Sequence, residues 1–307
     1  MERSMADGVL GLAIGDALGV PVEFKKRSTL QADPVTDLRE FGSHYQPMGT
    51  WSDDTSMTLA TVDSLKNGVD LSDVMQRFYN WYRNAEYTAG NRVFDVGIAT
   101  SHALTRFHQG IAPAKCGGTD EWDNGNGSLM RILPAAVYCH EKLREASIAQ
   151  KFAFIDDVSS LTHAHRRSHI GCEIYAFLVW AILETPTKDA IRTGLEQAKA
   201  WYEENPDLEA AAYSRLFAPN FADFPEDEIN SSGYVVSTLE AAVWCLLNSN
   251  SYEECVLKAV NLGDDTDTVG AVAGGLAGLL YGKAGIPEKW LEKLRRREYI
   301  EELCSGR

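Results

Sequence analysis

Residues 269–280 read VGAVAGGLAGLL, an apolar segment in which most positions are glycine or alanine. Glycine inside a helix costs about 1 kcal/mol relative to alanine, so a helix that carries this many is expected to pack backbone against backbone. Residues 9–20, VLGLAIGDALGV, have the same character, and Gly11, Gly15 and Gly19 fall on one helix face. We therefore expect two central helices, and since they lie near opposite ends of the chain, one domain over residues 1–307.

Helical periodicity dominates the rest of the chain, with apolar residues at three- and four-residue spacing and no convincing strand. The predicted helices span residues 6–18, 55–66, 71–83, 95–108, 129–140, 168–183, 187–204, 234–247, 252–261 and 268–281. Residues 25–50, 112–127 and 205–233 are expected to be irregular, and long loops in a compact domain are usually functional or mobile. A basic run over residues 293–297 is expected to end a late helix. The fold class predicted is all-α.

Composition excludes several kinds of partner. The 307 residues are 45% hydrophobic and carry a formal net charge of −15, which argues against a nucleic-acid or anionic-membrane surface. The six cysteines form no C-x-x-C pair, the N-terminus makes a poor signal peptide, and no apolar stretch approaches the roughly 18 to 20 residues of a membrane span. A cytoplasmic protein with reduced thiols is expected, and nothing in the sequence demands a partner chain, so we expect a monomer.

Two acidic motifs stand where helices are predicted to begin: GTWSDDT at residues 49–55 and GDDTDT at residues 263–268. Either motif alone is explained by helix capping. Together they hold more carboxylates than capping needs, and crowded carboxylates repel one another unless a cation neutralises them. The donors are hard oxygens, with no cysteine and no required histidine nearby, so we expect two Mg²⁺ or Mn²⁺ ions about 3.5 to 4 Å apart, and not Zn²⁺.

Other polar residues are less specific. Asp16, inside an apolar helix, is expected to be a structural hydrogen-bond acceptor, whereas Glu23 follows the helix end at Gly19 and Pro21. Residues 123–131, DNGNGSLMR, form a Gly/Asn loop before a helix, where free N–H groups and the Arg131 guanidinium can hold phosphate oxygens. Taken alone, such an Asn-Gly pair indicates only a turn.

Three histidines lie close together at positions 163, 165 and 169. A His-x-His pair without a third matched ligand is more often structural than metal-binding. We therefore expect a polar contact to a substrate in preference to a metal site.

With these residues in hand, the chain resembles the ADP-ribosylglycohydrolase family, which includes the dinitrogenase-reductase-activating glycohydrolases. The matching stretches occur in the family's order between residues 11 and 282: GLAIGDALGVPVEF, GTWSDDTSM, GNGSLMRILPAA, THAH, SGYVVSTLEAAVW and NLGDDTDTVGAVAGGLAGLLYG. Six stretches in sequence are far more specific than any one of them.

The resemblance implies a single-domain orthogonal helical bundle, a binuclear Mg²⁺ or Mn²⁺ centre, and ADP-ribose bound above the metals. The metal ligands that it implies are Ser52, Asp53, Asp54, Asp265, Asp267 and Thr268. Glu23 and Asp53 are the implied catalytic residues, and Asp264, which replaces a commoner glycine, is expected outside the metal ligands. The implied substrate-binding residues are Asn126, Gly127, Ser128, Arg131, His163 and Tyr234.

The function implied is hydrolysis of the bond between C1 of ribose and an acceptor atom through an oxocarbenium-like transition state. The acceptor expected is arginine on a protein. Serine, a nucleic-acid end or a small molecule would present the same ADP-ribose. A two-metal phosphoesterase, and an inactive scaffold that binds ADP-ribose or plays a structural part, are the alternatives.

Overall fold

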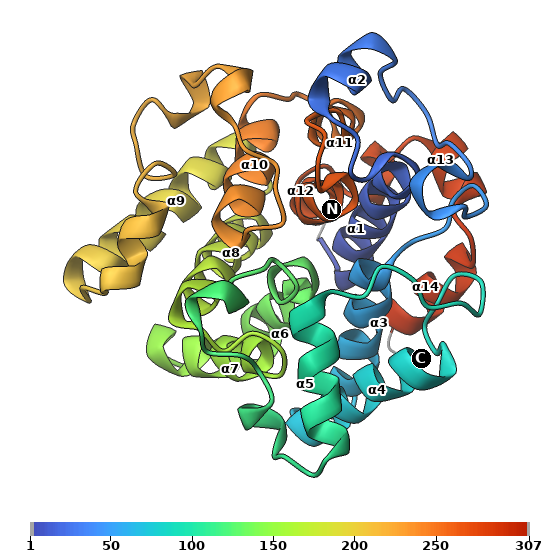
Figure 1. Ribbon diagram of the computed structural model, residues 1–307. Helices are drawn as coiled ribbons and strands as arrows, with labels where there is room; N and C mark the ends of the chain where they lie inside the picture. Colours follow the sequence, from blue (N-terminus) through green and yellow to red (C-terminus); the bar gives the residue numbers. More distant parts are fainter. Residues whose placement is uncertain (1–2, 306–307) are drawn as a thin grey trace.

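The computed structural model describes residues 3–305, and its regular elements are all helices (Figure 1). Within residues 3–305 there is no strand, only three isolated bridges, so the all-α prediction is confirmed. The α-helices are α1 (Met5–Gly19), α2 (Arg27–Ala32), α3 (Asp53–Leu65), α4 (Leu71–Asn84), α5 (Ile98–His108), α6 (Leu133–Lys142), α7 (Ile148–Ser160), α8 (Arg166–Glu184), α9 (Lys188–Glu204), α10 (Val235–Leu247), α11 (Tyr252–Asn261), α12 (Thr266–Tyr281), α13 (Glu288–Lys293) and α14 (Arg297–Cys304).

Helices α1 and α12 lie side by side in the middle of the molecule, although they come from opposite ends of the chain (Figure 1). Their glycines face one another across the contact. A Cβ atom on Gly15 would lie 2.0 Å from the carbonyl oxygen of Gly270, and one on Gly11 would lie 2.3 Å from that of Gly274. Only glycine fits at this distance, so the predicted backbone contact between the two central helices is confirmed.

The segment Met5–Val22 is long and apolar enough to cross a membrane, with a mean hydropathy of 1.4 over 18 residues. The expectation that no apolar stretch reaches this length was wrong for this segment. The same segment is 83% buried inside the protein. Its apolar character is accounted for by packing against α12 and the surrounding helices, because a helix at the centre of a core has no polar face.

Several boundaries differ from those predicted. Helix α5 begins at Ile98 and not at residue 95, because Asp95 adopts a left-handed backbone with φ of 54°. Residues 129–131 form a 3₁₀ turn, and α6 starts after it with a proline in its first turn. Helix α7 was not predicted, although Ser147 and Gln150 form a capping box that marks its start.

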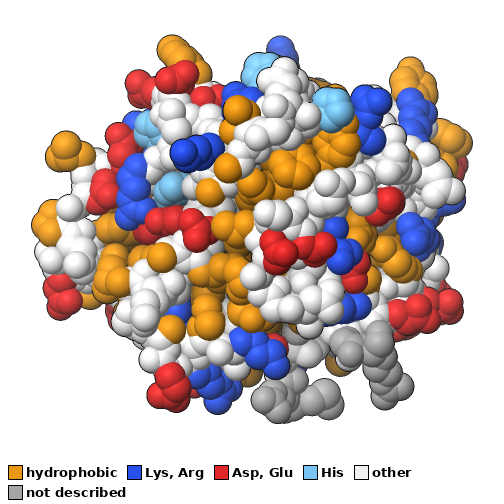
Figure 2. All heavy atoms as spheres, turned by 90° about the horizontal axis from the view of Figure 1, so that it is seen from below, with side chains coloured by type: hydrophobic (Ala, Val, Ile, Leu, Met, Phe, Trp, Pro, Cys, Tyr) orange, Lys and Arg blue, Asp and Glu red, His pale blue; other side chains and the backbone are white. Residues whose placement is uncertain are grey.

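The irregular segments are largely as predicted. The segment over residues 25–50 contains α2, and short 3₁₀ turns occur in all three. The basic run ends a helix only in part: its first residue, Lys293, is the last residue of α13, whereas Arg296 adopts a left-handed backbone with φ of 49° and α14 begins at Arg297. The face drawn in Figure 2 carries acidic and basic side chains interspersed.

Candidate active site

The two predicted acidic motifs meet where three helix ends come together. Helix α3 begins directly after Ser52, and α12 begins directly after Asp265. The Ser52 hydroxyl donates to Asp54 Oδ2 at 2.9 Å, and the Thr268 hydroxyl from α12 lies 3.4 Å from the same oxygen. Glu23 follows the short 3₁₀ turn Val20–Val22 at the end of α1. Residues more than 200 positions apart thus share one site.

Asp16 holds α3 in place from inside α1. Its carboxylate accepts from the backbone N–H groups of Ser52 and Thr55 and, at 2.6 Å, from the Thr55 hydroxyl. These bonds satisfy N–H groups at the start of α3 that have no partner within the helix. Burial raises the pKa of Asp16 to about 7, although these hydrogen bonds favour the ionised form. The structural acceptor predicted for Asp16 is present.

The acidic site, which we define as Glu23, Asp53, Asp54, Asp265 and Asp267, concentrates negative charge in a poorly solvated place. Burial and the neighbouring carboxylates raise the pKa of Glu23 to about 10. The same two causes raise the pKa values of Asp53, Asp54 and Asp267 well above the ordinary range, and burial also raises that of Asp265. Within residues 3–305, no lysine or arginine forms an ion pair with any of the five.

Several oxygens of the acidic site are buried without a hydrogen-bond partner. They are Asp54 Oδ1, Asp265 Oδ1 and Asp267 Oδ2, and the Thr50 hydroxyl nearby along the chain is in the same state. A buried acceptor with no donor is costly and rare in folded proteins. Unsatisfied carboxylate oxygens crowded together have the character of cation ligands, so the residues present fit a divalent metal ion.

Asp264 differs from its neighbours in the second motif. Its side chain is exposed, whereas Asp267 is fully buried. It also adopts a left-handed backbone with φ of 64°, and its N–H and C=O groups bond to Lys25 and Phe24. This placement agrees with the expectation that Asp264 is not a metal ligand.

Two residues of this region were not predicted. One possible ligand atom from each of Glu23, His44, Asp95 and Asp267 lies within 4.8 Å of the others. His44 lies in a segment predicted only as irregular, and Asp95 was assigned to the first turn of a helix. Neither has a local sequence signal, because folding alone brings both to the end of α1. The sequence motifs themselves contain no histidine, but folding places His44 beside them.

The Gly/Asn loop borders the acidic site on another side. The Asn126 side-chain amide donates to Asp265 Oδ2 and to the Thr238 hydroxyl, each at 2.9 Å. The loop is joined to the start of α10, since Asn126 N–H donates to Gly233 and Val235 N–H donates to Asn124. Gly127 is only partly buried, whereas the Ser128 side chain is fully buried and contacts Cys172. The Ser128 hydroxyl is therefore turned away from any substrate that binds in the site.

Arg131 does not reach this site. It is 0% exposed, donates to the Val158 carbonyl oxygen and to the Thr162 hydroxyl, and lies over the Phe78 ring. The predicted contact between Arg131 and a phosphate was therefore wrong, because this guanidinium is a core group. The prediction relied on distance along the chain, and the 3₁₀ turn after the loop points the side chain inward.

His163 lies directly beneath the Gly/Asn loop. A Cβ atom on Gly127 would lie 2.6 Å from His163 Cε1, so the loop needs glycine there. Burial and Arg131 lower the pKa of His163 to about 3, which keeps the imidazole neutral. Tyr234 caps α10 on the other side of the loop, and its hydroxyl accepts from Arg167 at 3.1 Å.

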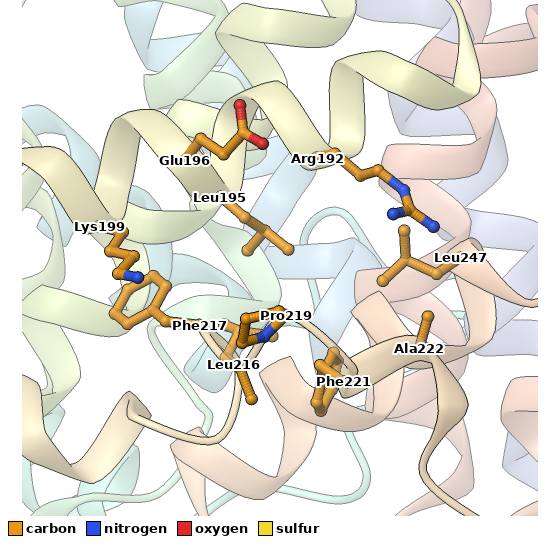
Figure 3. Close-up of a pocket in the computed structure, with 11 residues that line it drawn as sticks. Arg192, Leu195, Glu196, Lys199, Leu216, Phe217, Pro219, Phe221, Ala222 and Leu247 are labelled. Carbon is orange, nitrogen blue, oxygen red and sulfur yellow. The ribbon is translucent and has the colours of Figure 1, made fainter.

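A separate cavity of about 120 Å³ lies between α9 and residues 216–222 (Figure 3). Leu195, Phe217 and Phe221 line it, with Arg192 and Lys199 from α9 beside them. No residue of the acidic site contributes to its wall. The cavity is therefore separate from the acidic site and lacks its carboxylates.

The fold and site define a class of protein: an all-helical enzyme scaffold whose helix ends gather carboxylates suited to a cation. Residues 2–306 match the sequence model of the ADP-ribosylglycohydrolase family. The chain belongs to this family and is a hydrolase.

Three proteins illustrate the similarity. ADP-ribosylarginine hydrolase Tri1 of Serratia proteamaculans (strain 568) is 34% identical over 302 residues, which are 97% of this chain and 76% of the relative. ADP-ribosyl-[dinitrogen reductase] glycohydrolase of Rhodospirillum rubrum is 30% identical, over 93% of this chain and 88% of the relative. A solved ADP-ribosylglycohydrolase-related protein complex superimposes with a TM-score of 0.81 at 33% identity, covering 98% and 95% of the two chains.

Proposed function

We propose that this protein releases ADP-ribose from arginine side chains of mono-ADP-ribosylated proteins, with two divalent cations, Mg²⁺ or Mn²⁺, in the acidic site. The observation that carries the proposal is the set of buried, unpaired carboxylate oxygens on Asp54, Asp265 and Asp267. The arginine acceptor is supported by two relatives, 34% and 35% identical, that are ADP-ribosylarginine hydrolases.

The proposed cation ligands are Ser52, Asp53, Asp54, Asp265, Asp267 and Thr268. When bound, divalent cations would offset the charge of the carboxylates, orient sugar hydroxyls and lower the pKa of water in the site. The protein's contribution is to hold these oxygens before the substrate arrives. Asp16 fixes the start of α3, and the Asn126 amide fixes Asp265, so neither helix end needs to rearrange.

Glu23 and Asp53 are the proposed proton-transfer residues. Burial and the neighbouring carboxylates raise the pKa of Glu23, which favours the protonated carboxyl that a general acid needs. We assign it to deliver that proton to the leaving nitrogen, and Asp53 to accept one from the water that attacks C1. The Gly/Asn loop over residues 125–128 would hold the diphosphate through its backbone N–H groups other than that of Asn126, which donates to Gly233. His163 lies behind the loop, and Tyr234 would lie beside the adenosine.

The experiment that tests this proposal measures free ADP-ribose released from mono-ADP-ribosylated arginine and serine peptides, with Mg²⁺, Mn²⁺ or EDTA. We expect release from the arginine peptide that stops in EDTA. Release only from the serine peptide would replace the acceptor, and AMP in place of ADP-ribose would replace the reaction with phosphoester hydrolysis. No product from either peptide, despite binding of ADP-ribose by calorimetry, would favour another acceptor or an inactive scaffold.

A further inference from the structure

His44 reaches the acidic site from a loop that is anchored against the end of α1. Its Nε2 atom contacts Glu23 Oε2. The Ser43 hydroxyl donates to the Glu23 carbonyl oxygen at 2.6 Å, and the Gln46 side-chain amide donates to the His44 carbonyl oxygen at 3.1 Å. Gly42, with φ of 52°, sits so close to Pro21 that a Cβ atom would lie 1.9 Å from its carbonyl oxygen. The loop therefore holds His44 at the site by several independent contacts.

The imidazole ring is also fixed by its neighbours. The Phe94 ring lies 5.2 Å from the His44 ring, and the Phe24 ring lies 6.0 Å from it. The His44 side chain is only 14% exposed. With its ring flanked by two aromatic groups, His44 keeps Nε2 directed toward the carboxylates without help from a bound ligand.

The surroundings of Nε2 have the composition of a metal site. Ligand atoms of Glu23, Asp95 and Asp267 converge with it within 4.8 Å. Asp267 is 0% exposed, and its Oδ2 atom has no hydrogen-bond partner. A single imidazole cannot offset three carboxylates, so the group is short of positive charge as well as of hydrogen-bond donors.

We propose that His44 Nε2 is a ligand of one of the two cations, and that this nitrogen makes the site bind Mn²⁺ in preference to Mg²⁺. Mg²⁺ takes oxygen ligands almost exclusively. Mn²⁺ prefers the same carboxylate and hydroxyl oxygens but, as a first-row transition metal, also binds a nitrogen donor, although it stands at the weak end of that affinity series. A site of carboxylates and hydroxyls with a single imidazole supplies fewer nitrogen donors than the two or three histidines of the common thiolate-free zinc sites. The inference rests on the cation centre of the proposed function and names one more of its ligands.

The test uses the full chain loaded with Mn²⁺ and pulsed electron paramagnetic resonance, which detects coupling between Mn²⁺ and a directly bound ¹⁴N nucleus. We expect this coupling in the wild-type protein and its loss in His44→Gln, whose side chain keeps an oxygen donor. The matched control is His102→Gln on α5, an exposed histidine outside the site, which should keep the signal. Circular dichroism establishes that each variant is folded.

Calorimetry supplies the second readout. The ratio of the Mg²⁺ and Mn²⁺ dissociation constants should fall at least about ten-fold in His44→Gln, the scale seen when groups around a metal site are lost. A wild-type protein without ¹⁴N coupling, or a His44→Gln variant with an unchanged ratio, would show that His44 only positions Glu23. Coupling present in a protein that releases no ADP-ribose would overturn the proposed function and leave the ligand assignment standing. Absence of any metal binding would overturn both.

Discussion

Two clusters of carboxylates in residues 3–305, the buried acidic site and a partly buried group around Arg166, differ in the positive charge available to them. In the group around Arg166, on α8, the guanidinium lies 2.8 Å from Glu173, 2.7 Å from Asp207 and 3.3 Å from Asp156. The acidic site has more carboxylates and no lysine or arginine paired with them within residues 3–305. The Arg166 group therefore contains a cation of its own, although Asp156 Oδ1 has no hydrogen-bond partner, whereas the acidic site has no lysine or arginine to offset its charge.

The pKa values in the two groups express the same difference. Arg166 lowers the pKa of Asp207 below its ordinary range, although burial and Glu173 raise that of Asp156 to about 8. In the acidic site no carboxylate has a lowered pKa. Burial and the repulsion between the carboxylates both raise the pKa values there. Buried acids alone do not distinguish a functional site from a structural one, and the partner of each acid decides.

The largest effect should come from removing a carboxylate of the acidic site. Asp267→Ala takes away one unpaired oxygen and should abolish both metal binding and turnover, lowering kcat/KM by about a thousand-fold or more. The measurements are calorimetry with Mn²⁺ and release of ADP-ribose. Asp264→Asn is the matched control, because it removes an exposed charge three residues away and asparagine tolerates the same left-handed backbone. Full activity of Asp267→Ala would refute the cation assignment.

A slightly smaller effect is expected when Glu23 is replaced by a side chain that has no acidic proton but keeps an oxygen donor. Glu23→Gln should lower kcat by about 10² to 10⁴ and leave Mn²⁺ binding within a few-fold of wild type. Single-turnover release of ADP-ribose and calorimetry test the two halves separately. Loss of metal and activity together would make Glu23 a ligand before anything else.

The Arg166 group should respond in stability and not in chemistry. Arg166→Ala leaves the 1% exposed Glu173 without its cation. Breaking a fully buried pair costs about 3 to 5 kcal/mol, and because Arg166 is 35% exposed we expect about 2 kcal/mol. Urea unfolding measures the loss, with Arg144→Ala, which changes an exposed arginine without a salt bridge in residues 3–305, as the control. A drop in kcat of the folded Arg166→Ala variant would contradict the division between the two groups.

The sequence predicted the central features of both fold and site for physical reasons. The glycines of residues 269–280 indicated backbone contact because helical glycine has a cost that close packing offsets, and the two acidic motifs exceeded what capping requires. His44 and Asp95 were not predictable in this way. Both depend on left-handed loop residues, Tyr45 and Asp95 itself, and on contacts made only after folding. Arg131 was misplaced because the direction of a side chain after a turn is set by packing.

The last effect concerns the stability of the acidic site with and without cations, and only its change with pH is small. The folded pKa of Glu23, about 10, lies above its ordinary value of 4.5, so the cation-free protein binds more protons folded than unfolded between these values. Glu23 therefore contributes stability that is complete below about pH 4.5 and is lost as the pH rises toward 10. Asp16, with a pKa of about 7, acts in the same direction.

Mn²⁺ should offset this loss, because the cation binds the ionised carboxylates. At a free concentration 100-fold above its dissociation constant, it should stabilise the protein by about 2.7 kcal/mol. The gain in melting temperature over EDTA-treated protein, measured at fixed total Mn²⁺, should therefore grow from pH 7 to pH 8.5. Above pH 7 His163 adds little, since its pKa shift acts on the acid side. Arg166→Ala should keep the Mn²⁺ response, and Asp267→Ala should lack it. An equal response in both variants would show that the two carboxylate groups do not differ in their need for an external cation.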